Sequence, residues 1–140
     1  FDTEPRSLDD RRQWLAAHGG RFPVLVALND VGEVIGWASL SRFSERAAYE
    51  RTAENSVYID HRHRGAGIGT ALMTALMAEA HRARHHVIIA KITADNATSF
   101  AMHRRFGFIE AGRLREVGWK FDRWHDVVLM QALLDLDQRA

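Results

Sequence analysis

A short glycine-rich segment, HRHRGAGIGT from His61 to Thr70, has the residue types needed to bind an anion. Because glycine has no Cβ, neighbouring backbone N–H groups can converge on one oxygen, and the N-terminus of a following helix adds positive potential. A phosphate group fits such a turn. No Gly-Lys-Ser/Thr triplet ends the segment and no acidic residue follows in dinucleotide-binding register, which excludes two common nucleotide sites. The alternative is a turn whose glycines only let a helix pack closely on its strand.

Two histidine pairs could be metal ligands. They are His61 with His63, and His81 with His85 at the i, i+4 spacing of a helix. Neither pair has a nearby carboxylate or third ligand in a recognised pattern, so we expect surface histidines and no metal. The basic cluster from His61 to Arg64 could suggest RNA, but no aromatic stacking platform accompanies it.

Composition narrows the class of protein. The chain has 140 residues, 46% hydrophobic and 26% charged, which predicts a single domain covering residues 1–140. Its 19 basic and 18 acidic side chains give a net charge of +1, so no overall field favours nucleic acid or an anionic membrane. Cysteine is absent, which excludes thiol nucleophiles, thiolate metal sites and disulfides. Without a long apolar run or an opening signal peptide, we expect no membrane association and a cytoplasmic location.

The order of elements predicts an α/β (α+β) fold, with a mixed sheet and helices packed on it. Ser7, followed three residues later by Asp10, predicts a helix cap. The chain starts at Phe1 rather than Met, directly before this helix, so we expect that an N-terminal segment has been lost. Periodicity and turn residues predict, in order, a helix (8–18), a hairpin with its turn at 29–32, a loop (42–52), a strand (55–60), a helix (68–84), a strand (85–92), a helix (96–106) and two strands (106–117 and 126–134).

Two motifs resemble the core of the GNAT superfamily of N-acetyltransferases. The first is the strand VYI, the segment RHRGAGIG and the amphipathic helix after it; the second is DNATSFAMHRRFGF. The family pattern in the second motif falls on Asn96, Ser99, His103, Gly107 and Phe108. His103 stands where many members have a Tyr that protonates the departing CoA thiolate. The resemblance implies a mostly antiparallel GNAT-like sheet flanked by helices, and acetyl-CoA as co-substrate.

From Arg46 to Gln131 the chain is similar to the phosphinothricin N-acetyltransferase branch, including relatives that acetylate methionine sulfoximine. The segments AYERTAENSVYID and GRLREVGWKFDRWHDVVLMQ carry this similarity. Members of the branch begin with a strand and a helix that help to shape the acceptor site. This sequence lacks that strand and helix, so we expect a domain that is incomplete at its N-terminus.

The resemblance implies which residues bind acetyl-CoA. Backbone groups of one strand would bind the pantetheine arm, the glycine-rich loop would bind the pyrophosphate, and two residues of the second motif would hold the middle and the phosphate end. These three sets are Val57, Tyr58 and Ile59; Arg64, Gly65, Ala66, Gly67, Ile68, Gly69 and Thr70; and Asn96 and Arg105. Arg105 could equally be a solvated helix charge.

Acetyl transfer to an amine needs a base, because an α-amino group is mostly protonated at neutral pH. Glu54, just before a predicted strand, is the candidate, and its alternative is an ordinary solvated carboxylate. The leaving thiolate needs a proton donor, and His103 is the candidate. A helix histidine with satisfied hydrogen bonds is the alternative there. Free backbone N–H groups near Val57 would stabilise the oxyanion.

An amino-acid acceptor carries a carboxylate, which a guanidinium binds well. Arg46 is the candidate, and its neighbours by resemblance are Ser44, Glu45, Glu54, Asn55 and Ser56. Lys120, Phe121 and Trp124 could form part of the pocket wall, although aromatic residues of a C-terminal hairpin are more often core.

The sequence therefore predicts an acetyl-CoA-dependent N-acetyltransferase for the α-amine of a small amino acid or analogue, acting by direct attack in a ternary complex without a covalent acyl-enzyme. One alternative is a protein N-terminal or lysine acetyltransferase. Another is a non-catalytic module that binds acyl-CoA. A homodimer is implied by the resemblance alone.

Overall fold

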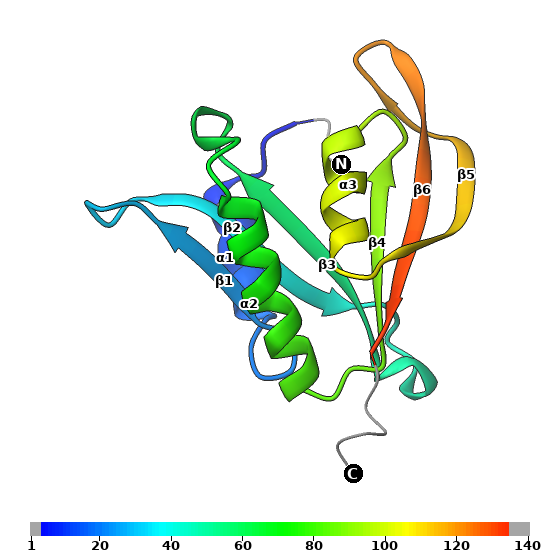
Figure 1. The fold of residues 1–140 in the computed structure, drawn as a ribbon, viewed down its shortest axis with the longest axis horizontal. Coiled ribbons are helices and arrows are strands. Elements are labelled where there is room, and N and C mark those ends of the chain that lie inside the picture. The colour runs from blue at the N-terminus through cyan, green and yellow to red at the C-terminus, as the bar shows by residue number, and fades with distance from the viewer. Residues whose placement is uncertain (1–3, 135–140) are drawn as a thin grey trace.

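The computed structural model describes residues 4–134, in which three α-helices and six strands follow one another in the predicted order (Figure 1). Phe1, on which the expectation of a lost N-terminal segment rests, lies outside the described residues. The helices are α1 (Leu8–Ala16), α2 (Ile68–Arg82) and α3 (Ala97–Arg105), with 3-10 turns η1 (Ala47–Tyr49) and η2 (His61–His63). The strands are β1 (Val24–Leu28), β2 (Val34–Arg42), β3 (Thr52–Ile59), β4 (Val87–Thr93), β5 (Ile109–Lys120) and β6 (Arg123–Leu133).

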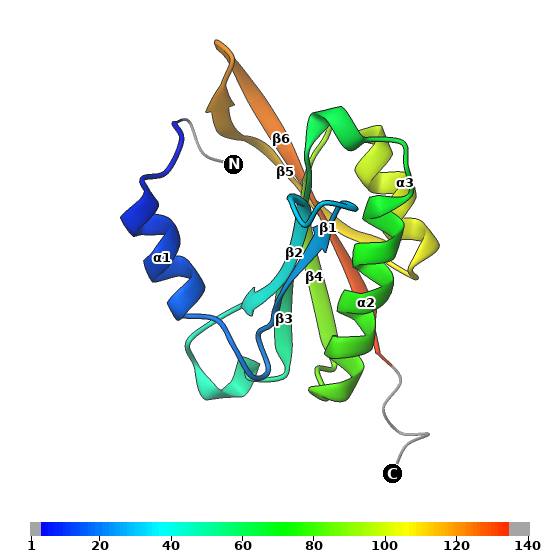
Figure 2. The same cartoon turned by 90° about the vertical axis from the view of Figure 1, so that its left-hand side faces the viewer.

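The strands form one six-stranded sheet in the order β1-β2-β3-β4-β6-β5. Its β3–β4 pair is parallel and the other four pairs are antiparallel, so the predicted mixed, mostly antiparallel sheet is confirmed. Helices α2 and α3 cover one face of the sheet, and α1 lies on the other face (Figure 2). Within residues 4–134, no helix combines the length and apolar character that a transmembrane span requires.

The main core lies between the sheet and the face covered by α2 and α3. Helix α2 is amphipathic and buries one stripe of side chains, Leu72, Met73, Leu76, Met77 and Ala80. The sheet contributes Ala38, Leu40, Ala53, Ile88, Ala90, Ile92, Val128 and Met130. Burial of each large aliphatic side chain stabilises the fold by about 1.5–3 kcal/mol, so this layer fixes α2 against the strands.

Strands β3 and β4 separate along their length. They pair only at Thr52↔Val87, Ala53↔Ile88 and Glu54↔Ile89. Beyond these pairs β3 stays paired with β2, and β4 stays paired with β6, so a wedge opens between them (Figure 1). The N-termini of α2 and α3 both lie at the open end of this wedge (Figure 1). The inner edge of β3 therefore presents unpaired backbone groups beside two helix N-termini.

Strand β3 starts at Thr52, earlier than the predicted start at Asn55. The antiparallel ladder with β2 continues to the Arg42↔Ala53 pair, and the short parallel ladder with β4 also begins there. Cross-strand pairing therefore extends the strand into a segment whose polar sequence suggested a loop. As a result Glu54 lies within β3, at the last residue pair before the strands separate.

Candidate active site

The glycine-rich loop lies between η2 and α2. Asp60 caps η2 by accepting the N–H of Arg62, and the Arg62 guanidinium donates to both carboxylate oxygens at 3.2 and 2.8 Å. These hydrogen bonds hold the pKa of Asp60 well below its usual range. Gly65 and Gly67 have φ angles of 83° and 80°, a left-handed conformation that glycine adopts without strain. The loop therefore turns directly into the first, unpaired N–H groups of α2.

The sequence suggested two purposes for the glycines, an anion-binding turn and close packing of a helix on its strand. The glycines differ in which of the two their surroundings fit. A Cβ added at Gly69 would lie 2.8 Å from Ile59 Cδ1 and 3.0 Å from Met102 Sδ, so Gly69 serves the close packing of α2 on β3 and α3. A Cβ at Gly65 or Gly67 would meet no atom within 4 Å, so that part of the loop faces open space. The remaining predicted loop contacts, Arg64, Ala66 and Thr70, are exposed, and Ile68 is half-buried.

Glu54 lies on the face of the sheet that also carries α1. Its Oε2 is 3.3 Å from the Nζ atom of Lys91 on β4, and its side chain is 28% exposed. Ser56 lies on the same face, because it is two residues further along the strand, and it is exposed. Tyr58 follows on this face, where its ring stacks on Trp37. The predicted base therefore borders solvent at the closed end of the wedge.

Asn55 and His103 meet on the opposite face, in the core. The His103 ring is only 4% exposed. Its Nδ1 lies 2.7 Å from the Ser99 carbonyl, so Nδ1 carries the hydrogen, and Nε2 accepts from the Asn55 amide at 3.0 Å. Burial lowers the pKa of His103, although the Ser99 hydrogen bond opposes this change. The ring is therefore neutral, and both of its nitrogens have partners.

The two other predicted cofactor residues of this motif lie at opposite ends of α3. Asn96 caps the N-terminus of α3 by accepting the Ser99 N–H at 3.1 Å. Arg105 is the exposed last residue of α3, about 13 Å along the helix axis from Asn96. Val57 and Ile59 occupy the separated part of β3, and both side chains face the α2 layer.

The loop that carries the predicted acceptor residues, 43–51 in the structure, lies on the α1 side of the sheet (Figure 2). The N–H of Arg46 donates to Ser44 Oγ at 3.2 Å, which starts η1, and the side chains of Glu45 and Arg46 are exposed. The loop thus shares a face with Glu54 but not with Asn55. Glu54 and Asn55 lie on opposite faces because they are neighbours in β3 and side chains alternate along a strand.

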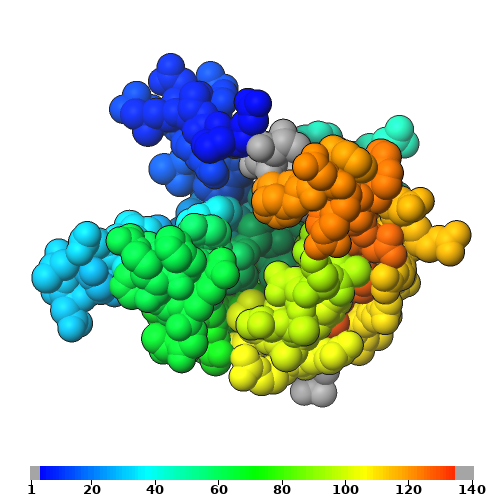
Figure 3. Space-filling model, turned by 90° about the horizontal axis from the view of Figure 1, so that it is seen from above, coloured from blue at the N-terminus to red at the C-terminus, as the bar shows by residue number. Residues whose placement is uncertain are grey.

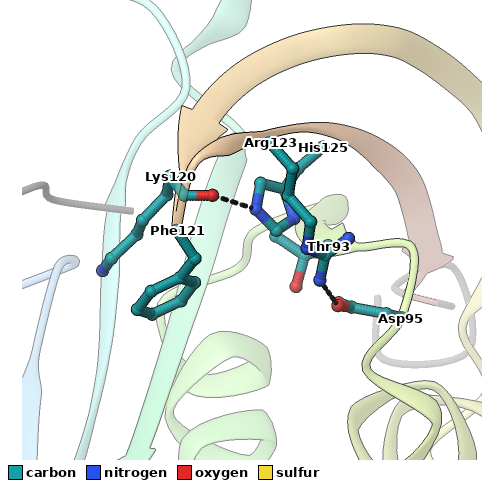
Figure 4. Close-up of a pocket in the computed structure, with 6 residues that line it drawn as sticks. All are labelled: Thr93, Asp95, Lys120, Phe121, Arg123 and His125. Atoms are coloured by element: carbon teal, nitrogen blue, oxygen red, sulfur yellow. Dashed lines mark hydrogen bonds and ion pairs between the residues drawn. The ribbon is translucent and has the colours of Figure 1, made fainter.

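The tip of the β5–β6 hairpin forms a small pocket beside the end of β4 (Figure 4). Its volume is about 170 Å³, and its lining residues are Thr93, Asp95, Lys120, Phe121, Arg123 and His125. Arg123 donates to Asp95 at 2.6 Å, which lowers the pKa of that carboxyl. Predicted wall residues Lys120 and Phe121 line this pocket, and Trp124 lines the adjoining one.

This pocket continues the face that carries Glu54, because Thr93 and Lys91 are alternate residues of β4. Seen from above, the molecule is hollowed between α1, the start of α2, α3 and the hairpin tip (Figure 3). Lys91, Asp95 and Arg123 lie at this site, although no sequence motif predicted them there. A single charge in the apolar segment HHVIIAKI was the signal that could have identified Lys91.

Of the histidines considered as metal ligands, His61 and His63 form η2 directly before the glycine-rich loop, whereas His85 lies in the core. His85 is fully buried, and its Nε2 donates to the Arg21 carbonyl at 2.7 Å. Across residues 4–134, no group of three or more His, Asp or Glu side chains is placed to hold a metal ion.

Comparison with known proteins identifies the family. Residues 1–108 match the model described as the Acetyltransferase (GNAT) family. An L-methionine sulfoximine/L-methionine sulfone acetyltransferase of Pseudomonas paraeruginosa is 39% identical over 141 residues, covering 100% of this chain and 82% of the relative. Two crystal structures share the fold. Ribosomal-protein-alanine N-acetyltransferase from Brucella melitensis is 44% identical, with a TM-score of 0.86 over 92% of this chain and 80% of that chain.

The second structure is a GNAT superfamily phosphinothricin acetyltransferase from Sinorhizobium meliloti in complex with AcCoA. It is 33% identical, with a TM-score of 0.87 over 97% of this chain and 74% of that chain. The chain therefore belongs to the acetyltransferase (GNAT) family, as its motifs predict, and is an acetyl-CoA-dependent N-acetyltransferase.

Proposed function

We propose that the enzyme acetylates the α-amine of a small amino acid or analogue, of the methionine sulfoximine or phosphinothricin type. The observation that carries this proposal is the position of Glu54 at the fork of the wedge, where β3 and β4 stop pairing. The relatives named for methionine sulfoximine and phosphinothricin support the acceptor class.

Acetyl-CoA enters along the separated edge of β3 in this proposal. Its pyrophosphate binds the N–H groups of Arg64, Gly65, Ala66, Gly67, Ile68, Gly69 and Thr70. The pantetheine arm follows the backbone of Val57, Tyr58 and Ile59, and Asn96 and Arg105 complete the contacts. This direction brings the thioester toward Glu54, since β3 runs from the fork to the loop.

The reaction then needs two proton transfers. Glu54 takes the ammonium proton, directly or through water, and the free amine attacks the thioester carbonyl. The N–H of Val57 stabilises the oxyanion, and collapse releases the CoA thiolate. His103 stays the predicted proton donor. Because its Nε2 accepts from Asn55, donation requires this nitrogen to gain a proton and the Asn55 contact to open.

The acceptor lies on the α1 side of the sheet in this proposal. Its carboxylate pairs with the exposed Arg46 guanidinium, and Ser44, Glu45 and Ser56 border it. Asn55 supports the site from the core through its contact with His103. The pocket beside Lys120 and Phe121 receives the side chain of the acceptor. A homodimer stays a prediction based on the resemblance, and a cytoplasmic location stays a prediction based on the sequence.

A protein N-terminal acetyltransferase is the second candidate function. The observation that favours it is the 44% identity to the Brucella melitensis structure named for ribosomal-protein alanine acetylation. A peptide acceptor has no free α-carboxylate next to its amine, so it would not need Arg46.

Release of free CoA thiol from acetyl-CoA tests the proposal. The acceptors are methionine sulfoximine, methionine sulfone, phosphinothricin, common amino acids and short peptides that begin with alanine. Glu54→Gln should lower kcat by about 10²–10⁴-fold with the amino-acid analogues. Glu50→Gln, an exposed carboxylate of the adjacent loop, is the matched control.

Arg46→Ala should raise KM for the acceptor by about 10- to 100-fold, as expected for a charged hydrogen bond worth about 1.5–3 kcal/mol. Arg46→Lys should recover only part of this loss, because lysine cannot form the bidentate contact. Turnover of the peptides alone, unaffected by Arg46→Ala, would establish the second candidate instead.

A further inference from the structure

A histidine outside the predicted site is hydrogen-bonded toward the predicted base. His18 follows α1, and its Nδ1 lies 2.7 Å from the Trp14 carbonyl. Since a carbonyl only accepts, Nδ1 carries the ring hydrogen in the neutral form. Nε2, 2.9 Å from Ser41 Oγ, therefore accepts the serine hydroxyl proton.

Ser41 is the residue of β2 directly opposite Glu54. The two form a register pair in the antiparallel β2–β3 ladder. Directly opposite residues of such a ladder stand on the same face with their Cβ atoms about 4.5–5.5 Å apart. Because the Ser41 hydroxyl donates to His18, its lone pairs are available to accept a proton from the Glu54 side.

Ser39 adds a second polar group to this face. It is two residues from Ser41 on β2 and opposite Ser56 on β3, so all four side chains of these two pairs share the face. Ser39 is fully buried, and its hydroxyl has no hydrogen-bond partner among residues 4–134. A buried hydroxyl without a protein partner takes an ordered water.

Aromatic rings hold His18 in place at the end of the series Glu54, Ser41 and His18. The Trp14 ring lies 4.2 Å from the His18 ring and 5.3 Å from Trp37, which is itself stacked on Tyr58. His18 is half-buried, so its inner side faces Ser41 while the ring still reaches solvent. An imidazole placed in this way can take a proton at one nitrogen and release it to bulk water.

We propose that Ser41 and His18 form the route by which the proton taken up by Glu54 leaves the site. This inference rests on the proposed role of Glu54 as the base. In the first step the acceptor ammonium gives a proton to the Glu54 carboxylate, leaving a neutral amine. In the second, the Glu54 carboxylic acid gives its proton to Ser41 Oγ, directly or through one water, while the Ser41 hydroxyl proton passes to His18 Nε2.

Glu54 is then a carboxylate again, Ser41 is again a hydroxyl, and His18 is an imidazolium that loses one proton to water or buffer. His18 and Ser41 touch neither substrate, so they are positioning and relay residues. The structure thus assigns a function to His18, which follows α1, and to Ser41 of β2. Both residues lie outside the sequence motifs.

The test compares kcat and both KM values for the wild type, His18→Ala, His18→Gln and Ser41→Ala, with acetyl-CoA and the best acceptor. We expect kcat to fall about tenfold, less than the 10²–10⁴-fold loss expected for the base itself, with both KM values unchanged. Added imidazole should restore kcat of His18→Ala in proportion to its free base. His86→Ala, which removes an exposed histidine, is the matched control.

His18→Gln separates relay from packing, because glutamine can keep the hydrogen bond to Ser41 but cannot carry the proton. Equal melting temperatures with a low kcat support the relay, as does retention of activity in Ser41→Thr. A His18→Gln variant with wild-type kcat, or a His18→Ala variant that imidazole does not restore, overturns it. If Glu54→Gln is as active as the wild type, the base itself is wrong; if Glu54→Gln is inactive and His18→Ala is normal, only the relay is wrong.

Discussion

At the residue scale, His103 has two roles that conflict. A proton donor needs a titratable nitrogen within reach of the thiolate, whereas both nitrogens of His103 are bonded within the core, to Ser99 and Asn55. The ring also packs edge-on against Phe108 at 4.9 Å. The structural contribution of His103 can therefore be measured independently of catalysis.

His103→Ala should lower the free energy of unfolding by about 2–4 kcal/mol. The change removes a buried ring from its contact with Phe108 and leaves the buried Asn55 amide with only its 3.6 Å contact to Met73 Sδ. Urea denaturation measures this loss. His86→Ala should change stability by less than about 0.5 kcal/mol, because its side chain is exposed. A His103→Ala variant with normal stability but no turnover would show that the residue acts only in catalysis.

Gly67→Ala should raise KM for acetyl-CoA. A left-handed φ of 80° costs a residue with a Cβ about 1 kcal/mol, so the loop would shift and its N–H groups would no longer converge. Gly32→Ala is a matched control, since Gly32 has a φ of 83° and equally open surroundings but lies in the β1–β2 turn. Steady-state kinetics should show a KM effect for Gly67→Ala alone. Equal KM values in the two variants would contradict a role for the loop in binding acetyl-CoA.

Site residues that lie close together in the sequence could be predicted from their spacing. Contacts that depend on how two strands are paired could not. Gly65, Gly67 and Gly69 lie within one short motif, and their spacing alone indicated the loop. The Arg123–Asp95 pair joins residues of two elements whose proximity depends on the β4–β6 register, which no local pattern encodes.

At the element scale, the wedge between β3 and β4 follows from a short parallel ladder. Each strand keeps a longer antiparallel partner on its outer side, and strand twist rotates the two pairs apart beyond Glu54. The apolar residues of segments 55–60 and 85–92 predicted both β3 and β4 as strands. Where their pairing ends depends on the registers of the β2–β3, β3–β4 and β4–β6 ladders, which no local pattern encodes, so the sequence did not predict the position of Glu54 at the fork.

The closed end of the wedge is held by side-chain contacts between connecting segments. His85 Nε2 donates to the Arg21 carbonyl at 2.7 Å, Arg21 Nε donates to the Ala83 carbonyl, and Arg51 Nε donates to the Arg84 carbonyl. Burial lowers the pKa of His85, and the nearby charges of Arg21 and Arg51 lower it further. Protonation of His85 is therefore unfavourable in the folded state.

The melting temperature should accordingly fall as the pH drops below 6.5, the ordinary histidine value. Below that pH the unfolded chain binds a proton at His85 that the folded protein excludes, so the stability present above pH 6.5 is lost as the pH falls. One such group contributes at most about 1.4 kcal/mol per pH unit. Differential scanning calorimetry in buffers of matched ionic strength measures the slope.

His85→Gln isolates this contribution, because glutamine can still donate to the Arg21 carbonyl. Its slope below pH 6.5 should be smaller than that of the wild type, though not zero, since burial also lowers the pKa of His103. The carboxyls of Asp95 and Asp126 titrate at lower pH and do not interfere. An unchanged slope in His85→Gln would mean that His85 is protonated in the folded protein.

At the scale of the whole molecule, the sheet separates two sets of residues. The α1 face carries Glu54, Lys91 and the 43–51 loop, whereas Asn55 and His103 lie on the α2–α3 face. The wedge is where both faces become accessible to one ligand. This arrangement predicts an acyl donor that lies between the strands and an acceptor that approaches from the α1 face.

Acetyl-CoA bound in the wedge would bridge β3 and β4, so it should stabilise the whole fold. At 100 times Kd a ligand adds about 2.7 kcal/mol to the free energy of unfolding, which raises the melting temperature of a domain of this size by about 5–10 °C. Glu54→Gln should show the same rise, because the base contacts the acceptor rather than the donor, whereas Gly67→Ala should show a smaller one. Thermal scans with acetyl-CoA test this directly. A full rise in the wild type without turnover of any acceptor would identify a non-catalytic acyl-CoA-binding module, and no rise would place the donor outside the wedge.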